Sequence, residues 1–143
     1  IQRRGVTLAK MLQEMIEQVE GVKLPLGVLD ITFYRDDLSI LSEHPVVNAT
    51  DLPFQVQDAR IVMVDDVLFS GRTARAAMDA ICDMGRPSCI QLAVMIDRGH
   101  RDLPIRADYV GKTLPTSKSE LVGVRVPEFD GDMSVVLYEK RSE

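Results

Sequence analysis

The sequence predicts an α/β fold built on a mostly parallel sheet flanked by helices. Three observations predict it: an apolar run at residues 61–64, a helical period over residues 73–84, and a second apolar run at residues 90–96. Short β-branched runs bounded by polar residues suit strands that are covered on both faces, as in parallel sheets. A strand, a helix and a strand in succession predict a right-handed crossover unit.

The elements before and after this unit are predicted from the same signals. A helix begins just after Gly5 and ends at Gly21, because apolar residues recur on one face between them. Residues 24–33 are predicted as a strand. The polar, Pro-punctuated residues 35–54 are predicted as a long loop, and loops of this length are usually functional or mobile. Shorter strands are predicted at residues 109–110, 122–126 and 134–138.

Length and composition bound the domain organisation. A chain of 143 residues with 45% hydrophobic content predicts one domain spanning residues 1–143. No apolar run is long enough to span a membrane and no signal peptide is visible, so we expect a cytoplasmic protein without a membrane partner. Cys82 and Cys89 are then expected to be reduced, half-buried thiols without a disulfide or metal role.

The most informative segment lies between the first apolar run and the helix that follows it. Asp65 and Asp66 are expected at the carboxyl end of the strand, where ligands of open α/β sheets bind. They can accept hydrogen bonds from sugar hydroxyls or hold a hydrated Mg²⁺. Ser70, Gly71 and Thr73 leave backbone N–H groups uncovered at a helix N-terminus, which favours a phosphate. The simpler alternative is an ordinary solvated strand end. The Walker A and GxGxxG motifs are absent.

Val64 to Thr73 resembles the PRPP-binding motif of type I phosphoribosyltransferases. Other segments resemble the PyrR family across nearly the whole chain: residues 29–38, 85–87, 97–112 and 115–120. The resemblance implies a type I phosphoribosyltransferase fold with a mobile hood loop between residues 35 and 54. In that family the run Ile1–Gly5 is the pyrophosphate loop, which follows an earlier helix and strand. We therefore expect the domain to be N-terminally incomplete, with about three or four dozen residues before Ile1.

The PyrR family pairs uracil phosphoribosyltransferase activity with control of pyrimidine operons. The resemblance implies that PRPP and uracil give UMP and pyrophosphate, with Mg²⁺ accompanying PRPP. It also implies attenuation of transcription through binding to the pyr mRNA leader, and assembly into dimers or larger homo-oligomers. Two alternatives remain open: a phosphoribosyltransferase for another base, and a nucleotide-sensing RNA-binding regulator with little turnover.

The resemblance assigns residues to PRPP. Asp65 and Asp66, which would meet Mg²⁺ only indirectly, and Arg35 are the expected catalytic residues. Arg35, with Asp36 and Asp37, would close over the site and exclude water; otherwise these three form a solvated charged turn. The full set expected to bind PRPP is Arg4, Gly5, Asp65, Asp66, Val67, Leu68, Phe69, Ser70, Gly71, Arg72 and Thr73.

Phe69 guides the choice of base. Purine-using relatives place an acid three positions after the second acid of the motif, where it exchanges a proton with the base; here that position is Phe69. Uracil needs no acid at that place. The base-binding residues are expected at the carboxyl end of the neighbouring strand, at Met95, Ile96, Asp97 and Arg98.

RNA binding does not follow from composition. A formal charge of −5, a pI near 5 and 5% aromatic content argue against a generally basic nucleic-acid binder. The charge is nevertheless locally positive, and the positions that match the RNA-binding face of the family are His100, Arg101, Arg106 and Lys112. The alternative is a set of solvated or intersubunit ion-pairing side chains.

Overall fold

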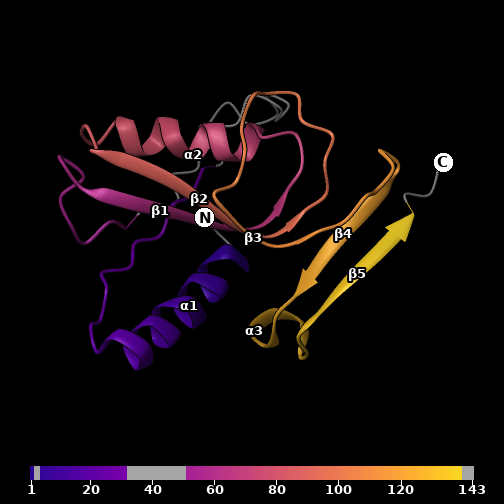
Figure 1. The fold of residues 1–143 in the computed structure, drawn as a ribbon, viewed down its shortest axis with the longest axis horizontal. Helices are drawn as coiled ribbons and strands as arrows, with labels where there is room; N and C mark the ends of the chain where they lie inside the picture. The colour runs from indigo at the N-terminus through magenta and orange to yellow at the C-terminus, as the bar shows by residue number, and fades with distance from the viewer. Residues whose placement is uncertain (2–3, 32–50, 140–143) are drawn as a thin grey trace, which may run out of the picture.

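The computed structural model describes residues 1, 4–31 and 51–139. Its centre is a parallel sheet in the order β1-β2-β3, formed by β1 (Arg60–Leu68), β2 (Cys89–Asp97) and β3 (Tyr109–Thr113) (Figure 1). β1 and β2 pair along their whole length, from Arg60 opposite Cys89 to Leu68 opposite Asp97. The predicted α/β architecture with a parallel sheet is therefore confirmed, and the carboxyl ends of β1 and β2 lie side by side.

Two helices cover opposite faces of this sheet (Figure 1). α2 (Arg72–Cys82) buries four alanines and one isoleucine: Ala74, Ala76, Ala77, Ala80 and Ile81. These side chains belong to the larger core, which also contains Met63 of β1 and Leu92 of β2. α1 (Arg4–Glu20) lies on the other face, where Leu8 packs with Ile96 in a second, smaller core.

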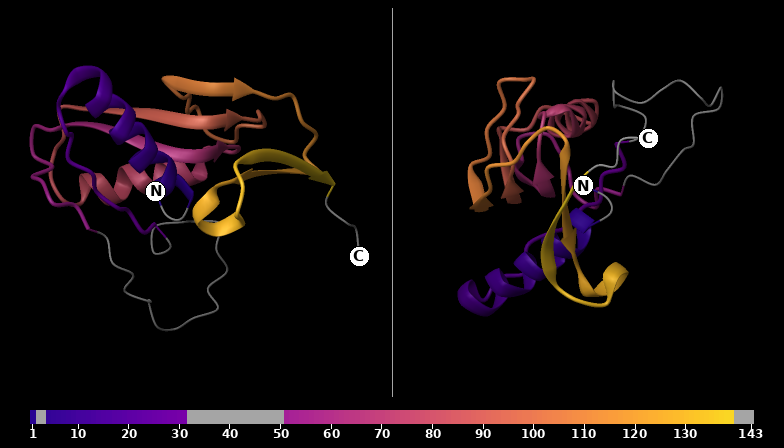
Figure 2. Two further views of the ribbon diagram at one scale, coloured as in Figure 1. Left: turned by 90° about the horizontal axis from the view of Figure 1, so that it is seen from below. Right: turned by 90° about the vertical axis from the view of Figure 1, so that its right-hand side faces the viewer.

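A β-hairpin carries the C-terminal part of the described chain. β4 (Glu120–Arg125) and β5 (Ser134–Glu139) pair antiparallel, and the short helix α3 (Pro127–Asp130) lies between them. Figure 2 shows this hairpin beside the start of α1 and next to the parallel sheet. Val124 and Val126 complete the smaller core. The hairpin therefore packs against the edge of the molecule where β1 and β2 end.

Three expectations need correction. Residues 24–31 form no strand in the described part of the chain; they make one isolated bridge, between Val28 and Asp51. Cys82 and Cys89 are exposed rather than half-buried, because both lie at element ends. β1 continues to Leu68, so the two acids lie inside the strand.

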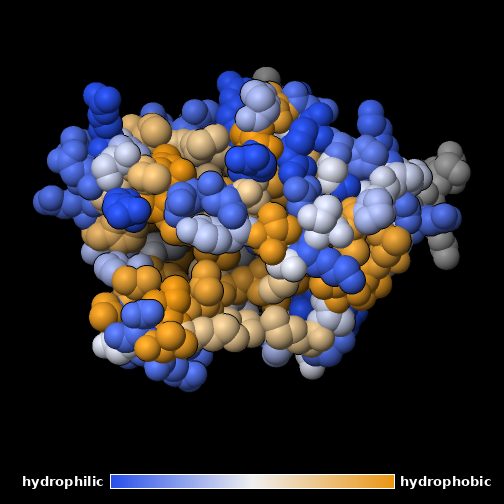
Figure 3. All heavy atoms as spheres, viewed as in Figure 1, coloured by the Kyte–Doolittle hydropathy of each residue, from blue (hydrophilic) through white to orange (hydrophobic). Residues whose placement is uncertain are grey.

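A cavity of about 670 Å³ lies between α1 and β1. Its walls are mostly apolar and include Leu12, Ile16, Val62 and Met63. Figure 3 shows hydrophobic residues at the surface along α1 and along the recess above it. The cavity lies beside the first half of β1, away from the turn that follows Leu68. Within the described ranges, no helix is long and apolar enough to cross a membrane.

Candidate functional site

The two acids of β1 are held in a defined arrangement. An oxygen of Asp65 accepts a hydrogen bond from the Asp66 N–H at 2.8 Å, and an oxygen of Asp66 accepts one from the Val67 N–H at 2.9 Å. Asp65 is 9% exposed. Burial, and then the adjacent charge of Asp66, raise the pKa of Asp65 well above the usual range of a carboxyl. Such a carboxyl is stabilised by hydroxyl donors or by a cation brought to it by a ligand.

The start of α1 lies directly on these acids. A Cβ atom at Gly5 would stand 2.8 Å from the Val64 carbonyl oxygen and 3.3 Å from the Cα of Asp65. Only a glycine permits that approach, because real Cβ contacts of 2.8 Å are essentially not tolerated. Gly5 and Asp65, 60 positions apart in the chain, therefore belong to one site.

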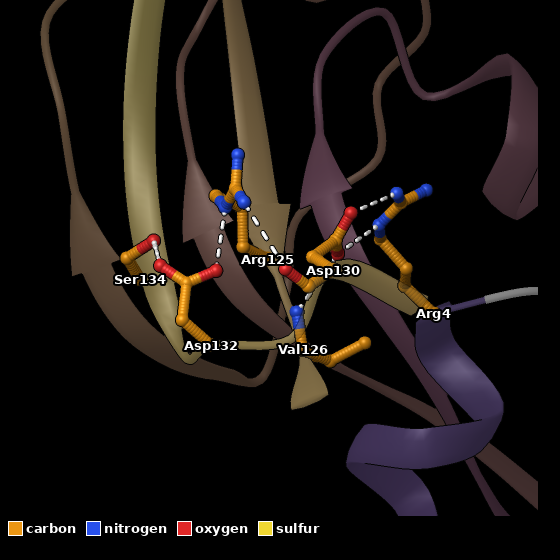
Figure 4. Close-up of polar contacts among 6 residues, drawn as sticks. All are labelled: Arg4, Arg125, Val126, Asp130, Asp132 and Ser134. Carbon is orange, nitrogen blue, oxygen red and sulfur yellow. Dashed lines mark hydrogen bonds and ion pairs between the residues drawn. The ribbon is translucent and has the colours of Figure 1, made fainter. Parts of the chain in front are cut away.

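Arg4 is paired with an acid that the sequence did not single out. Its guanidinium donates to both carboxylate oxygens of Asp130, from Nη2 at 2.9 Å and from Nε at 3.2 Å (Figure 4). The guanidinium also lies 5.8 Å from the centre of the Phe129 ring. Asp130 accepts a third hydrogen bond from the Val126 N–H, and its own carbonyl accepts one from Arg125. Arg4 is thus fixed by the hairpin, while its role with pyrophosphate stays a prediction.

The pairing of Arg4 with Asp130 predicts an acid-sensitive contribution to stability. The Arg4 hydrogen bonds, with that from Val126, lower the pKa of Asp130 to about 2, against 3.8 ordinarily. A lowered pKa stabilises the fold above pH 3.8, and this contribution is lost as the pH falls through 2. Asp130→Asn should therefore melt below the wild type at pH 5 and together with it near pH 2. A gap between the melting temperatures that is unchanged across this range would contradict the prediction.

The turn after β1 has the geometry of an anion site. Gly71 has φ of +92°, a left-handed conformation that glycine adopts without strain, and α2 begins immediately after it. A Cβ at Gly71 would lie 3.3 Å from that of Ile105, so the turn packs tightly on the segment after β2. The Arg72 N–H donates to Ser70 Oγ at 3.2 Å. The first turn of α2 contains no acidic side chain, so no carboxylate there repels a phosphate at this helix N-terminus.

The expected base-binding segment lies beside this turn, but its side chains differ in availability. Ile96 is buried in the smaller core, so only its backbone could meet a base. Asp97 accepts hydrogen bonds from the Gly99 N–H and from Arg101. Arg98 is 4% exposed, and its guanidinium carbon lies 4.1 Å from the centre of the Phe69 ring. The side chain at the base-selecting position is therefore stacked on Arg98.

The match to known families extends over nearly the whole chain. A model of the family described as "Phosphoribosyl transferase domain" matches residues 1–128. "Bifunctional protein PyrR" of Caldicellulosiruptor bescii is 69% identical over 137 residues, which are 96% of this chain and 75% of that protein. The chain belongs to the PyrR family. The proteins of the same name from Acetivibrio thermocellus and Deinococcus radiodurans are 63% and 54% identical, over 92% and 97% of this chain and 71% and 76% of their own.

The PyrR family is one of phosphoribosyltransferases, and the type I phosphoribosyltransferase fold is confirmed. Among solved structures, the hypoxanthine phosphoribosyltransferase of Trypanosoma cruzi is similar at 20% identity and a TM-score of 0.49. That likeness covers 64% of this chain and 53% of the other chain.

In this PyrR-family chain the four predicted RNA-binding residues divide into two pairs. Arg106 and Lys112 are exposed. His100 and Arg101 face inward: the His100 ring lies 5.9 Å from the Phe69 ring and bonds the Thr116 carbonyl. The Arg101 guanidinium donates within the chain from three nitrogens. The first pair is thus accessible to a nucleic acid, whereas the second contacts the phosphate turn.

Several predicted residues lie outside the described part of the PyrR-family chain. These are Arg35, Asp36 and Asp37, together with Gln2 and Arg3 of the expected pyrophosphate loop. Asp130, Thr116 and Ser117 are residues that sequence reasoning missed: Asp130 holds Arg4, and the other two hold Arg98 by hydrogen bonds of 3.1 and 2.8 Å. No motif marks Asp130, whereas Thr116 and Ser117 lie in the 115–120 segment that resembles the PyrR family but had no role assigned.

Proposed function

We propose that this chain transfers the phosphoribosyl group of PRPP to uracil, giving UMP and pyrophosphate, and that it also binds the pyr mRNA leader to attenuate transcription. The observation that carries the enzymatic part is the continuous unit from Asp65 to Thr73. It joins two adjacent carboxyls, a glycine turn and a helix N-terminus within one stretch of backbone. The PyrR relatives, at up to 69% identity, support both parts.

Each group has a role that its chemistry suits. Transfer breaks the bond from ribose C1 to a pyrophosphate oxygen and forms a bond from C1 to a uracil nitrogen. Positive charge builds on the sugar, so positioning and electrostatics dominate. Asp65 and Asp66 accept hydrogen bonds from the ribose hydroxyls, and the turn with Ser70 and Thr73 holds the 5′-phosphate. Arg4 faces the pyrophosphate, and Arg35 serves the closing loop.

Magnesium fits this site as a companion of PRPP. The described residues contain no group of three metal-ligating side chains, so a resident metal has no cage among them. Two adjacent carboxylates suit indirect contact with a hydrated Mg²⁺ carried by the substrate. When bound, the ion neutralises charge on the pyrophosphate.

The choice of uracil is supported by the surroundings of Phe69. That ring contacts Arg98 and His100, so a phenyl group occupies the position at which purine-using relatives place an acid. Uracil is read instead by backbone groups and side chains at Met95, Ile96, Asp97 and Arg98.

A radiolabelled-uracil assay tests the enzymatic proposal. Labelled UMP should form only when PRPP and Mg²⁺ are both present. Product from orotate or a purine, with none from uracil, would instead support a phosphoribosyltransferase for another base. If RNA retention changed on addition of UMP but no turnover could be measured, the result would support a nucleotide-sensing RNA-binding regulator with little turnover.

The exposed pair Arg106 and Lys112 gives the RNA proposal its test. Arg106→Ala with Lys112→Ala should weaken retention of a pyr leader RNA and lower the slope of log affinity against log salt by about 1.4, since each lost phosphate contact contributes about 0.7 for a single strand. Uracil turnover should be unchanged. Arg75→Ala, an exposed arginine on α2, is the matched control. Unaltered RNA affinity in the double variant would refute this RNA face.

We also propose that the chain assembles into dimers or larger homo-oligomers in the cytoplasm. Exposed apolar side chains on β5 support assembly: Val135, Leu137 and Tyr138. Light scattering behind a sizing column measures the assembled mass, and a monomer at micromolar concentration would contradict the proposal.

A further inference from the structure

Three consecutive carbonyl groups of the phosphate turn bond to one segment. The Leu68 carbonyl accepts from the Arg98 N–H at 3.1 Å. The Phe69 carbonyl accepts from Arg101 Nη1 at 2.8 Å. The Ser70 carbonyl accepts from the N–H groups of Asp102 at 2.9 Å and Leu103 at 3.2 Å. The segment from residue 98 to 103 therefore holds every carbonyl in this part of the turn.

These bonds also orient the N–H groups of the turn. In a planar trans peptide the C=O of one residue and the N–H of the next point in opposite directions. With the Phe69 and Ser70 carbonyls held by the 98–103 segment, the N–H groups of Ser70 and Gly71 point away from it. Neither N–H makes a hydrogen bond to any residue that the structure describes. Two adjacent backbone donors next to a helix N-terminus are thus available to an anion.

Arg101 is the one side chain among these anchors. Backbone N–H groups hold the carbonyls of Leu68 and Ser70, whereas a guanidinium holds that of Phe69. The guanidinium is itself braced, since Nη2 bonds Asp97 at 2.6 Å and Nε bonds the Ile105 carbonyl at 2.9 Å.

The charges around this anchor agree with its geometry. Burial acts to raise the pKa of Asp97, but hydrogen bonds from Arg101 and from the Gly99 N–H outweigh it and hold that pKa below its ordinary value. Asp97 is therefore an anionic brace at neutral pH. The Arg101 side chain is 22% exposed, in contrast to Arg106, which is open to solvent.

We propose that Arg101 is a positioning residue of the phosphate turn: braced by Asp97, it holds the Phe69 carbonyl and so aims the Ser70 N–H at the 5′-phosphate of PRPP or UMP. This inference rests on the proposed phosphoribosyl site. Arg101 differs in this from Arg106 and Lys112, whose side chains are exposed.

The test compares UMP and PRPP binding in Arg101 variants of the full chain. Arg101→Ala should weaken UMP, measured by calorimetry, by about tenfold or more, the usual effect of losing a hydrogen bond to a charged group. The KM for PRPP should rise in parallel, while the KM for uracil stays within about twofold. Arg101→Lys should recover part of the affinity, because it keeps the charge but not the planar fork.

Two further variants complete the test. Arg101→Met keeps the apolar stem without any donor, and it replaces the alanine variant if that variant does not fold. Arg75→Ala, on the far side of α2, is the arginine control. A UMP affinity in Arg101→Met within twofold of this control would overturn the inference, even with full turnover in the wild type. If the wild type bound UMP but did not make it, the proposed activity would be overturned. The UMP affinities of the variants would still decide whether Arg101 positions the turn.

Discussion

Asp65→Asn combined with Asp66→Asn is expected to lower uracil turnover by a factor of about 10² to 10⁴, because each carboxylate would lose a charge-assisted hydrogen bond to a ribose hydroxyl. Asparagine keeps one side-chain oxygen, so the bonds from the Asp66 and Val67 N–H groups can persist. The fold should therefore survive. Initial rates with saturating PRPP and uracil measure the turnover, and a thermal melt of the same protein shows whether the fold survives.

The melting temperature of this double variant should equal or exceed that of the wild type. Asp65 is buried beside Asp66 in the free protein, and this arrangement lowers the stability of the fold. The binding of a ligand offsets that cost. Asp79→Asn with Asp83→Asn, at the exposed end of α2, is an isosteric control with the same change in charge. A folded double variant that keeps more than a tenth of the wild-type rate would rule out the assigned role of the acids.

Gly5→Ala is expected to have the second largest effect, a loss of about 10²-fold in kcat/KM. The new methyl group would meet the Val64 carbonyl at 2.8 Å, so the start of α1 must move away from β1. A displacement of about 1 Å at a reacting site costs on the order of 10²-fold in rate. The same movement pulls Arg4 away from Asp130, so binding of pyrophosphate should weaken with the rate.

Gly21→Ala is the matched control for this variant. Gly21 ends α1 with φ of +70°, and a methyl group added there would have no heavy atom within 4 Å, so alanine adds backbone strain without a clash. It should cost roughly 1 kcal/mol of stability and leave turnover unchanged. If Gly5→Ala resembled this control, with a lower melting temperature but a normal rate, the close approach of α1 to the acids would be unimportant for catalysis.

Local signals predicted the elements that depend on neighbouring residues. The period of α2, its start beside Gly71 and the apolar runs of β1 and β2 are visible in any short window of the sequence. Residues 24–31 show the limit of this approach. They are apolar enough for a strand, but a strand needs partners along its length, and within the described ranges only Val28 has one, in Asp51. α3 was missed because a helix of four residues carries no period.

The contiguous part of the candidate site was predictable for the same reason. The acids, the glycine turn and the helix N-terminus follow one another along the chain, so their chemistry could be predicted together.

The sequence by itself determined that this chain carries a phosphoribosyl motif and belongs with phosphoribosyltransferases, because that chemistry is written in one contiguous segment. Tertiary structure alone decided that Asp130 holds Arg4 from 126 positions away, and that Arg101 bonds the Phe69 carbonyl across 32. Which arginine meets which acceptor depends on how strands and the hairpin converge at one edge of the sheet. A sequence contains the donors and acceptors, but their pairing is fixed only when packing brings them within hydrogen-bond distance.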